Sequence, residues 1–281
     1  MYMLPTVIAM LIAEYDGRAI APWIPTYRLK WTSMTTNSSD GALDLLESKP
    51  WLINARRAYS NTNSRIVPHL RGDSINTRAL SENPAPHALR MLRECPDLLH
   101  WDGISANTNS NMLQYAFSIA PSNMKMSFLL SNRGAIPYIW HILPTTEVHN
   151  LCMNESKTAM DIIKKIHNDP NDPRYEQIEW VYLSANNSDG ALDLLESYPQ
   201  KIDWSAFSSN SNTRAVQMLR QNPNDIIAEF LCSNENPDAM RLLGELYTND
   251  RSILLDWDAI SANPATFSYP DQKIVQILLE V

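Results

Sequence analysis

The sequence predicts an all-α protein, an α/α solenoid of about ten short helical-hairpin repeats with a period of about 24 residues. The main observation is a recurring pattern, Ile-(Asp/Asn)-Trp-x-x-(Leu/Ile)-Ser-x-Asn, whose clearest copy is residues 202–210. A second observation is composition, because 44% of the 281 residues are hydrophobic and only 19% are charged, which is enough to bury a core. The pattern closes on a series of asparagines: Asn37, Asn61, Asn83, Asn107, Asn132, Asn154, Asn186, Asn210, Asn234 and Asn263.

The residues before each closing asparagine predict a short helix, named helix B here. A tryptophan stands six positions before the asparagine in five repeats, and an apolar residue follows the tryptophan three positions later, on the same helical face. The residue before the tryptophan is a good N-cap, as Asp203 is in the clearest copy, with Asn54, Asn76 and Glu179 as counterparts. We expect these tryptophans in equivalent buried sites: Trp31, Trp101, Trp180, Trp204 and Trp257.

A second helix, named helix A, is predicted to start two positions after the asparagine. Asn or Ser stands there as an N-cap in six repeats, at Asn63, Asn109, Ser156, Ser188, Asn212 and Asn236. A recurring small Ala then allows close helix packing, and a proline thirteen residues past the asparagine ends the helix, as at Pro199. The asparagine itself is expected to bond backbone groups that the helix ends leave unpaired.

In chain order, residues 1–22 are expected to form an N-terminal capping helix. The apolar run at residues 1–13 has no basic segment before it and is too short to cross a bilayer, so we favour a cap over a secretion signal. The array runs over residues 23–263, is irregular over 108–175, and carries a proline-rich loop insertion at 169–173. Residues 264–281 are expected to form a C-terminal capping half-repeat, because an open stack leaves an apolar face uncovered.

Residues 39–48 recur identically as residues 188–197, 149 positions later. An identical segment among diverged repeats indicates duplication of a block of about six repeats, or gene conversion. The repeat resembles the tandem repeats of largely uncharacterised proteins of nucleocytoplasmic large DNA viruses (giant viruses). Trp23-Ile24-Pro25 and the segment from Asn263 to Phe267 are similar to the ends of those arrays, although the family's Asn-Pro is kept in few repeats here. This resemblance implies no catalytic residues.

No motif for catalysis, phosphate binding or a metal stands out, so we expect no enzyme, no cofactor and no small-molecule substrate. His141, His149 and Cys152 come closest to a ligand cluster, but two of them occupy positions of the repeat frame. The three cysteines are expected to be buried, reduced thiols. The net charge of −8 argues against a nucleic-acid partner, and no segment is long enough for a membrane span.

Charge is distributed unevenly along the chain, with about +2 over residues 1–100 and about −10 over residues 176–281. The position five residues before each closing asparagine is variable and mostly polar, which predicts a solvent-facing column with a basic patch near one end of the array and an acidic one at the other. The candidate interaction surface consists of Arg56, Arg57, Arg78, Asp102, Glu229 and Asp258.

An extended surface of stacked helices usually binds protein, so the sequence predicts a non-enzymatic protein–protein interaction scaffold or adaptor. With the resemblance, this implies a giant-virus protein in the host cytoplasm or the virion, and not a secreted one. The alternative is a structural component of the virion, such as a minor capsid or internal virion protein.

Overall fold

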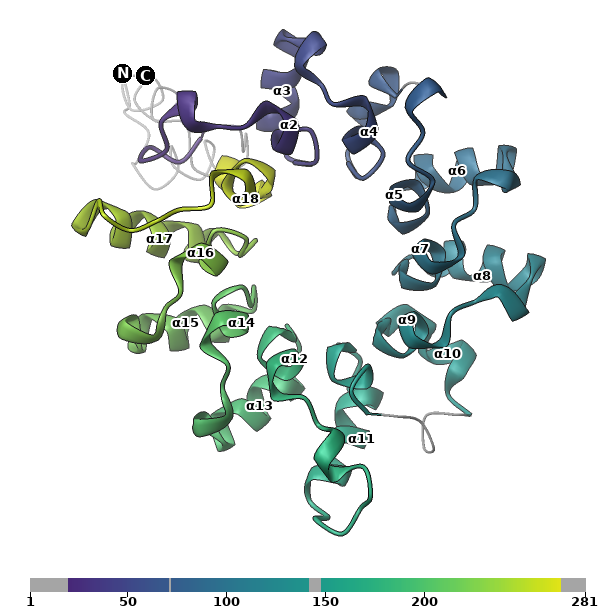
Figure 1. Ribbon diagram of the computed structural model, residues 1–281, viewed down its shortest axis with the longest axis vertical. Coiled ribbons are helices and arrows are strands. Elements are labelled where there is room, and N and C mark those ends of the chain that lie inside the picture. The colour runs from purple at the N-terminus through teal and green to yellow at the C-terminus, as the bar shows by residue number, and fades with distance from the viewer. Residues whose placement is uncertain (1–19, 71, 142–147, 269–281) are drawn as a thin grey trace, which may run out of the picture. The chain divides into compact units, whose positions relative to one another are not determined.

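The structure is a computed structural model that describes residues 20–70, 72–141 and 148–268, and all regular structure in these ranges is helical (Figure 1). The all-α prediction is therefore confirmed for the part of the chain described. The chain divides into two compact units. Unit 1 combines Met1–Arg71 with Ala228–Val281, and unit 2 is Gly72–Ile227. Where the sequence predicts one array over 23–263, unit 1 is assembled from segments near both ends of the chain.

Unit 2 consists of helical hairpins in which short B helices alternate with longer A helices. Its B helices are α5 (Thr77–Glu82), α7 (Trp101–Ala106), α9 (Met126–Ser131), η9 (Leu151–Met153), α12 (Trp180–Ala185) and α14 (Trp204–Ser208). Its A helices are α6 (Pro86–Glu94), α8 (Ser110–Ile119), η7 and α10 (Arg133–Ala135 and Ile136–Ile139), α11 (Lys157–His167), α13 (Asp189–Ser197) and α15 (Thr213–Gln221). Short 3-10 turns connect A to B: η4 (Gly72–Ser74), η5 (Pro96–Leu98), η6 (Pro121–Asn123), η10 (Tyr175–Gln177), η11 (Pro199–Lys201) and η12 (Pro223–Asp225).

Unit 1 is built from helical hairpins of the same kind. Its B helices are α2 (Trp31–Met34), α4 (Ala55–Ala58), α16 (Ala228–Leu231) and α18 (Trp257–Ala262), and its A helices are α3 (Asp40–Ser48), η3 (Ser64–His69) and α17 (Pro237–Asn249). The turns are η1 (Thr26–Arg28), η2 (Pro50–Leu52) and η13 (Pro264–Phe267).

The predicted helix boundaries and caps are largely confirmed. All six residues expected to cap helix A accept a backbone N–H bond in its first turn. Asp203, Asn54 and Asn76 cap their B helices in the same way, whereas the prediction for Glu179 is wrong because its side chain makes no cap bond. The sequence after Asn63 forms a 3-10 helix because Pro68 removes an amide that an α-helix would need.

Prolines end helix A as the sequence predicts. Helix α13 ends at Ser197 and Pro199 starts a 3-10 turn, and the same order recurs before Pro50, Pro96 and Pro223. The small residue of helix A is fully buried in each clear copy: Ala42, Ala88, Ala191, Ala215 and Ala239. The insertion at 169–173 is a turn segment outside any helix.

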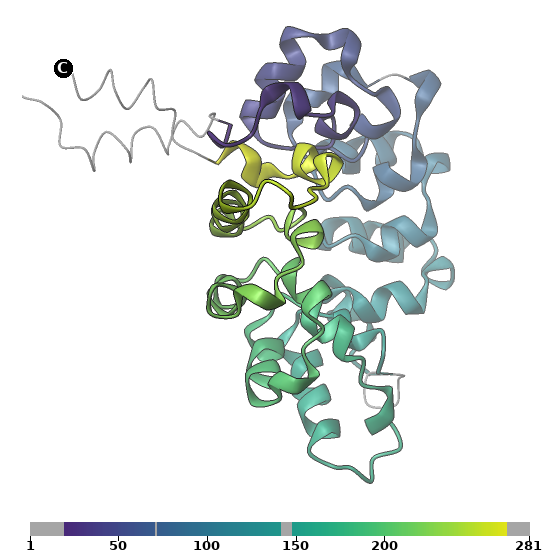
Figure 2. The same cartoon turned by 60° about the vertical axis from the view of Figure 1, so that its left-hand side comes forward.

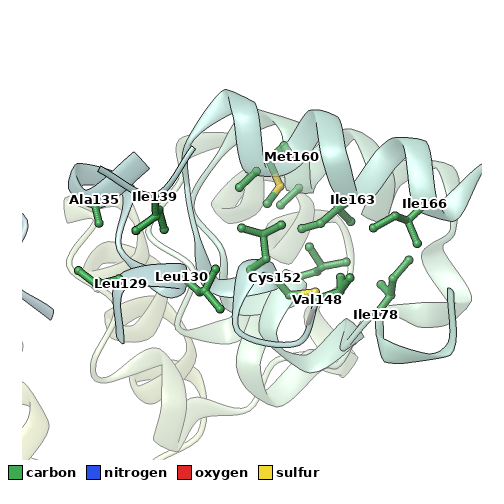
Figure 3. Packing of buried hydrophobic residues seen from close by; sticks show 14 of the residues in the cluster. Leu129, Leu130, Ala135, Ile139, Val148, Cys152, Met160, Ile163, Ile166 and Ile178 are labelled. Atoms are coloured by element: carbon green, nitrogen blue, oxygen red, sulfur yellow. The ribbon is translucent and has the colours of Figure 1, made fainter. Parts of the chain in front are cut away.

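The core of unit 2 lies between its A and B helices. Ile163 and Ile166 point from α11 toward Val148 and Ile178, as Figure 3 shows, and all four are buried. The apolar residue three positions after the tryptophan position of each B helix is also buried in every repeat of the unit, as Leu183 is in α12. The 3.6-residue period of the sequence thus becomes a continuous line of packed side chains.

In unit 1 the first and last B helices of the described chain pack against each other. Helix α2 lies beside α18 (Figure 1), and in Figure 2 the purple segment after residue 20 runs next to the yellow segment that holds α18 and η13. The Ala21 N–H donates to the Thr266 carbonyl over 2.9 Å. The outer faces of the first and last repeats, which the predicted terminal caps were expected to cover, are therefore in contact with each other.

The expected caps themselves fall mostly outside the described residues. The structure describes only residues 20–22 of the capping helix predicted at 1–22, and these are not helical. Of the half-repeat predicted at 264–281 it describes residues 264–268, which contain the 3-10 turn η13.

Candidate interaction surface

The closing asparagines bond backbone groups, as predicted, and the structure adds that they join neighbouring repeats through backbone carbonyls. Asn210 is fully buried, and its Nδ2 donates to the carbonyls of Ser184 and Asn186 in the preceding repeat, each at 2.9 Å. Its Oδ1 accepts the N–H of Asn212 at 3.0 Å, at the start of the following helix A. Asn61, Asn107, Asn132, Asn186 and Asn263 make the same pair of bonds to two carbonyls of the repeat before them.

A second ladder runs through the Ser or Thr hydroxyl that stands two positions before six of the asparagines. The Ser184 hydroxyl donates to the carbonyl of Trp180 and accepts the N–H of Asp203 in the next repeat. Ser81, Ser105, Ser208 and Thr35 accept the corresponding N–H. The sequence analysis includes this serine in its pattern but assigns it no contact, although its constant spacing from the asparagine was the available signal.

Two cysteines occupy the hydroxyl column. Cys232 donates from Sγ to the Ala228 carbonyl, as the serines do, and burial raises the pKa of the Cys152 and Cys232 thiols to about 11. All three cysteines are free. Cys152 and Cys232 are buried as expected, but the expectation is wrong for Cys95, which is exposed just after the end of α6. Groups of three or more residues placed to hold a metal ion are not found in the described part of the chain.

The ladders also connect the last repeat to the first inside unit 1. Asn37 donates to the carbonyls of Ser261 and Asn263, and the N–H of Lys30 donates to the Ser261 hydroxyl at 2.7 Å. These are the bonds that sequence neighbours form elsewhere. The first repeat therefore follows the last one in the stack of unit 1.

This contact corrects the expected charge layout of the candidate surface. Arg57 donates to the Ser33 hydroxyl at 2.9 Å, and that hydroxyl donates to Asp258. By their positions in the sequence, Arg57 is near one end of the array and Asp258 is near the other, whereas the structure joins them through one serine. The idea of a basic patch opposite an acidic one is wrong for this pair because α2 packs on α18.

The other candidate residues are solvent-facing, as predicted. Arg56 and Glu229 are exposed in unit 1, and Asp102 is half-buried in unit 2. Arg78 is exposed and donates to Glu82 at 2.8 Å, and this bond, with a further contribution from Asp102, raises the pKa of the Arg78 guanidinium. Exposed pairs of this kind contribute little to binding or stability.

The five tryptophans of the B helices are partly exposed, so the expectation that they are buried is wrong. All five tryptophans stand first in their B helices and are half-buried. The first residue of a helix faces the preceding turn, so one side of the ring remains accessible. Cations cover some of these rings: the Lys49 Nζ lies 5.0 Å from the Trp31 ring centre, and the Lys201 Nζ lies 5.8 Å from that of Trp180.

The duplicated segment supports contacts between repeats, and not a separate site. Arg214 pairs with Asp193 and Glu196 of the helix before it, and Asn212 donates to Asp189. In the other copy Arg65 and Asn63 make the same contacts with Asp44, Glu47 and Asp40. In both copies, therefore, the ten identical residues are contacted by an Asn and an Arg of the next repeat, and these two residues are the same in both copies.

The most exposed apolar side chains of unit 1 lie in the turns that lead into its B helices. Tyr27, Trp51 and Leu254 are 81%, 73% and 86% exposed. They belong to the repeats of α2, α4 and α18, so two of the three are in the hairpins that pack on each other. We call these three residues the apolar rim.

Unit 2 carries polar residues at the matching position. Trp51 directly follows Pro50, whereas the residues after the corresponding prolines of unit 2 are Asp97, Ser122, Gln200 and Asn224. Tyr27 and Trp51 share one repeat position, ten residues before Asn37 and Asn61, and Leu254 stands one position later, nine residues before Asn263. Single exposed apolar residues are ordinary, but several large ones in the turns of one unit make a candidate interaction surface.

A cleft opens beside the rim in unit 1, between η1, α2 and the C-terminal end of α3. Its volume is about 400 Å³. It is lined by Thr26, Tyr27, Leu29, Trp31, Met34, Leu45, Ser48 and Lys49. We call it the rim cleft. Its walls are mainly apolar, and Lys49 is its single charged residue.

Comparisons with models of known protein families, with curated proteins and with solved structures give no match. A search of the described residues finds no helix with the length and apolar character needed to cross a membrane.

Proposed function

We propose that this protein is a non-enzymatic scaffold that binds a partner protein through the apolar rim of unit 1. Its helical hairpins are proposed to form an α/α solenoid of about ten repeats with a period of about 24 residues. The observation that carries the proposal is the exposure of Tyr27, Trp51 and Leu254, where unit 2 has polar residues at the matching turn. Aromatic anchors of this kind supply most of the binding energy in protein interfaces.

The setting of this role is proposed from the repeat's resemblance alone. The repeat resembles those of giant-virus proteins, so the scaffold is proposed to act in the cytoplasm of an infected cell or in the virion. The ladders suit such a role because they hold the turns at fixed spacing, which reduces the ordering cost when a partner binds.

Site-specific cross-linking tests the proposed function. A photo-reactive phenylalanine analogue at position 51 should capture one partner from infected cells, while the same group at position 224, the matching turn of unit 2, should not. The captured protein is then purified, and its affinity is measured by calorimetry.

The variant Tyr27→Ser, Trp51→Asn, Leu254→Ser gives the rim the polar character of unit 2. We expect it to bind the purified partner at least about 30-fold more weakly, since one buried tryptophan anchor contributes about 2 kcal/mol. Equal affinity of the wild type and this variant, with an unchanged circular dichroism spectrum, excludes the rim as the binding surface.

A further inference from the structure

The equivalent place in unit 2 holds a cluster of aromatic rings, and this cluster indicates what kind of group fits the rim cleft. Trp31 and Lys49 stand 149 residues before Trp180 and Tyr198, in the two copies of the duplicated block. In the unit 2 copy the His167 ring lies among three aromatic rings. Its centre is 5.6 Å from that of Tyr175, 5.4 Å from that of Trp180 and 4.6 Å from that of Tyr198.

The unit 1 copy has lost two of these aromatic walls. Thr26 stands at the position of Tyr175, and Lys49 at that of Tyr198. The result is the open rim cleft, with Trp31 at its base and the exposed Tyr27 at its edge. The same helical frame therefore packs three aromatic rings around His167 in one unit, and in the other the described residues line a cleft of about 400 Å³.

Two cations lie at or near this cleft. Lys49 lies over the Trp31 ring, and the Arg28 guanidinium is 5.8 Å from the Tyr27 ring centre and 5.7 Å from that of Trp257. Among the described residues neither cation has a carboxylate within 4.0 Å. Both can therefore pair with carboxylates of a ligand while they remain stacked on the rings.

We propose that the rim cleft binds an aromatic side chain from an acidic peptide segment of the partner protein. The ring enters between Tyr27 and Trp31, and flanking carboxylates pair with Lys49 and Arg28. The inference rests on the proposed scaffold function and specifies its ligand. Two cations suit the few carboxylates of a peptide, whereas a nucleic acid would meet a chain of net charge −8.

Short probe peptides test the ligand chemistry on the full chain. The probe is the acetylated and amidated pentapeptide Glu-Asp-Phe-Asp-Glu, and binding is followed by the NMR signals of the tryptophan indole N–H groups. The Trp31 signal, assigned with Trp31→Phe, should shift on titration to saturation in the millimolar range. A peptide with Ala in place of Phe, and one with Lys in place of the acidic residues, should each bind at least about fivefold more weakly.

Charge reversal gives a matched pair of variants. Lys49→Glu should weaken binding of the acidic probe by about tenfold, because it replaces an attractive pair with a repulsive one. Lys201→Glu removes the corresponding cation over Trp180 in unit 2 and should leave the affinity unchanged. Equal effects of the two reversals would show that net charge, and not the cleft, determines binding.

Other outcomes overturn the proposal in distinct ways. Equal binding of the Ala peptide would remove the aromatic requirement, and tighter binding of the oligonucleotide dT5 would identify a base-stacking site. A gain in probe affinity of tenfold or more on deleting residues 269–281 would show that the chain's own segment competes for the cleft. If the probe fails but the partner captured at position 51 still depends on the rim, the cleft inference is wrong and the scaffold function stands.

Discussion

Replacing Asn210 by Ala tests whether the asparagine ladder holds the repeats together. The change removes two bonds from Nδ2 to carbonyls of the preceding repeat and one bond from a backbone N–H to Oδ1. The site is fully buried, so water cannot replace these bonds without opening the repeat. At about 1 kcal/mol for each lost bond and more for a carbonyl left unpaired, the expected loss of unfolding free energy is about 3–4 kcal/mol.

Urea denaturation followed by tryptophan fluorescence and by circular dichroism measures this loss, and the two probes together show whether unit 2 unfolds in one step. Asn224→Ala is the matched control, because Asn224 is exposed in a turn of the same unit and should change the free energy by less than about 0.5 kcal/mol. Asn210→Asp should be worse than Ala at neutral pH, since a carboxylate would face two carbonyl oxygens. A loss below about 1 kcal/mol for Asn210→Ala would refute the argument that the ladder stabilises the stack.

Four further substitutions give three more tests. Phe207→Ala, at a fully buried ring, should cost about 3–5 kcal/mol of unfolding free energy, and Trp204→Ala, at a half-buried ring, about 2 kcal/mol; equal losses in urea denaturation would contradict this difference. Gly244→Ala should cost about 1–3 kcal/mol in the same assay, because the new Cβ would overlap the Trp23 ring, and an unchanged midpoint would show that this ring moves aside freely. Burial lowers the pKa of His87, and the nearby charge of Arg90 lowers it further. The unfolded state therefore binds a proton at a higher pH than the folded state, and the free energy of unfolding should fall as pH drops below about 6.5. His87→Gln should reduce this pH dependence, measured as the urea midpoint against pH, and an identical dependence would exclude His87 as its source.

The hairpins were predictable because their signals are local. An N-cap such as Ser188 and a helix-ending Pro199 act within one or two turns, and the small Ala191 marks the close approach of helices. The role of the closing asparagines also followed from local chemistry, since a buried amide beside two helix ends has backbone groups within reach. The exception, Glu179, is a longer side chain and a weaker cap than Asp or Asn.

The pairing of α2 with α18 could not be predicted, because the residues that make it look like those of any other repeat. Asn37 and Ser261 have the same types and spacing as their counterparts between sequence neighbours, and 224 positions separate them. The exposure of the tryptophan frame was missed for a different reason. The i,i+3 pattern places the ring on the buried face of helix B, and the predicted N-cap places it at the first residue of that helix. Neither pattern shows that a ring at this first residue meets solvent on one side.

The candidate surface was chosen by charge, whereas the surface that we propose is apolar. The charged column faces solvent as expected, but Arg57 and Asp258 take part in hydrogen bonds inside unit 1. Tyr27, Trp51 and Leu254 were visible in the sequence as apolar residues in turns. Their exposure was not, because an apolar residue near a turn can equally fold back onto the core.

The contact between the first and last hairpins has a consequence for how such a chain can evolve. In an open repeat array the terminal repeats keep a free face that a further copy can cover. Here the faces of α2 and α18 are joined by the same kind of bonds that Asn61, Asn107, Asn132, Asn186 and Asn210 make to the repeat before them, so a new copy placed between α2 and α18 would have to separate Asn37 from Ser261. Growth is then easier by duplication inside the array, and residues 39–48 and 188–197, the two identical segments, both lie in its interior.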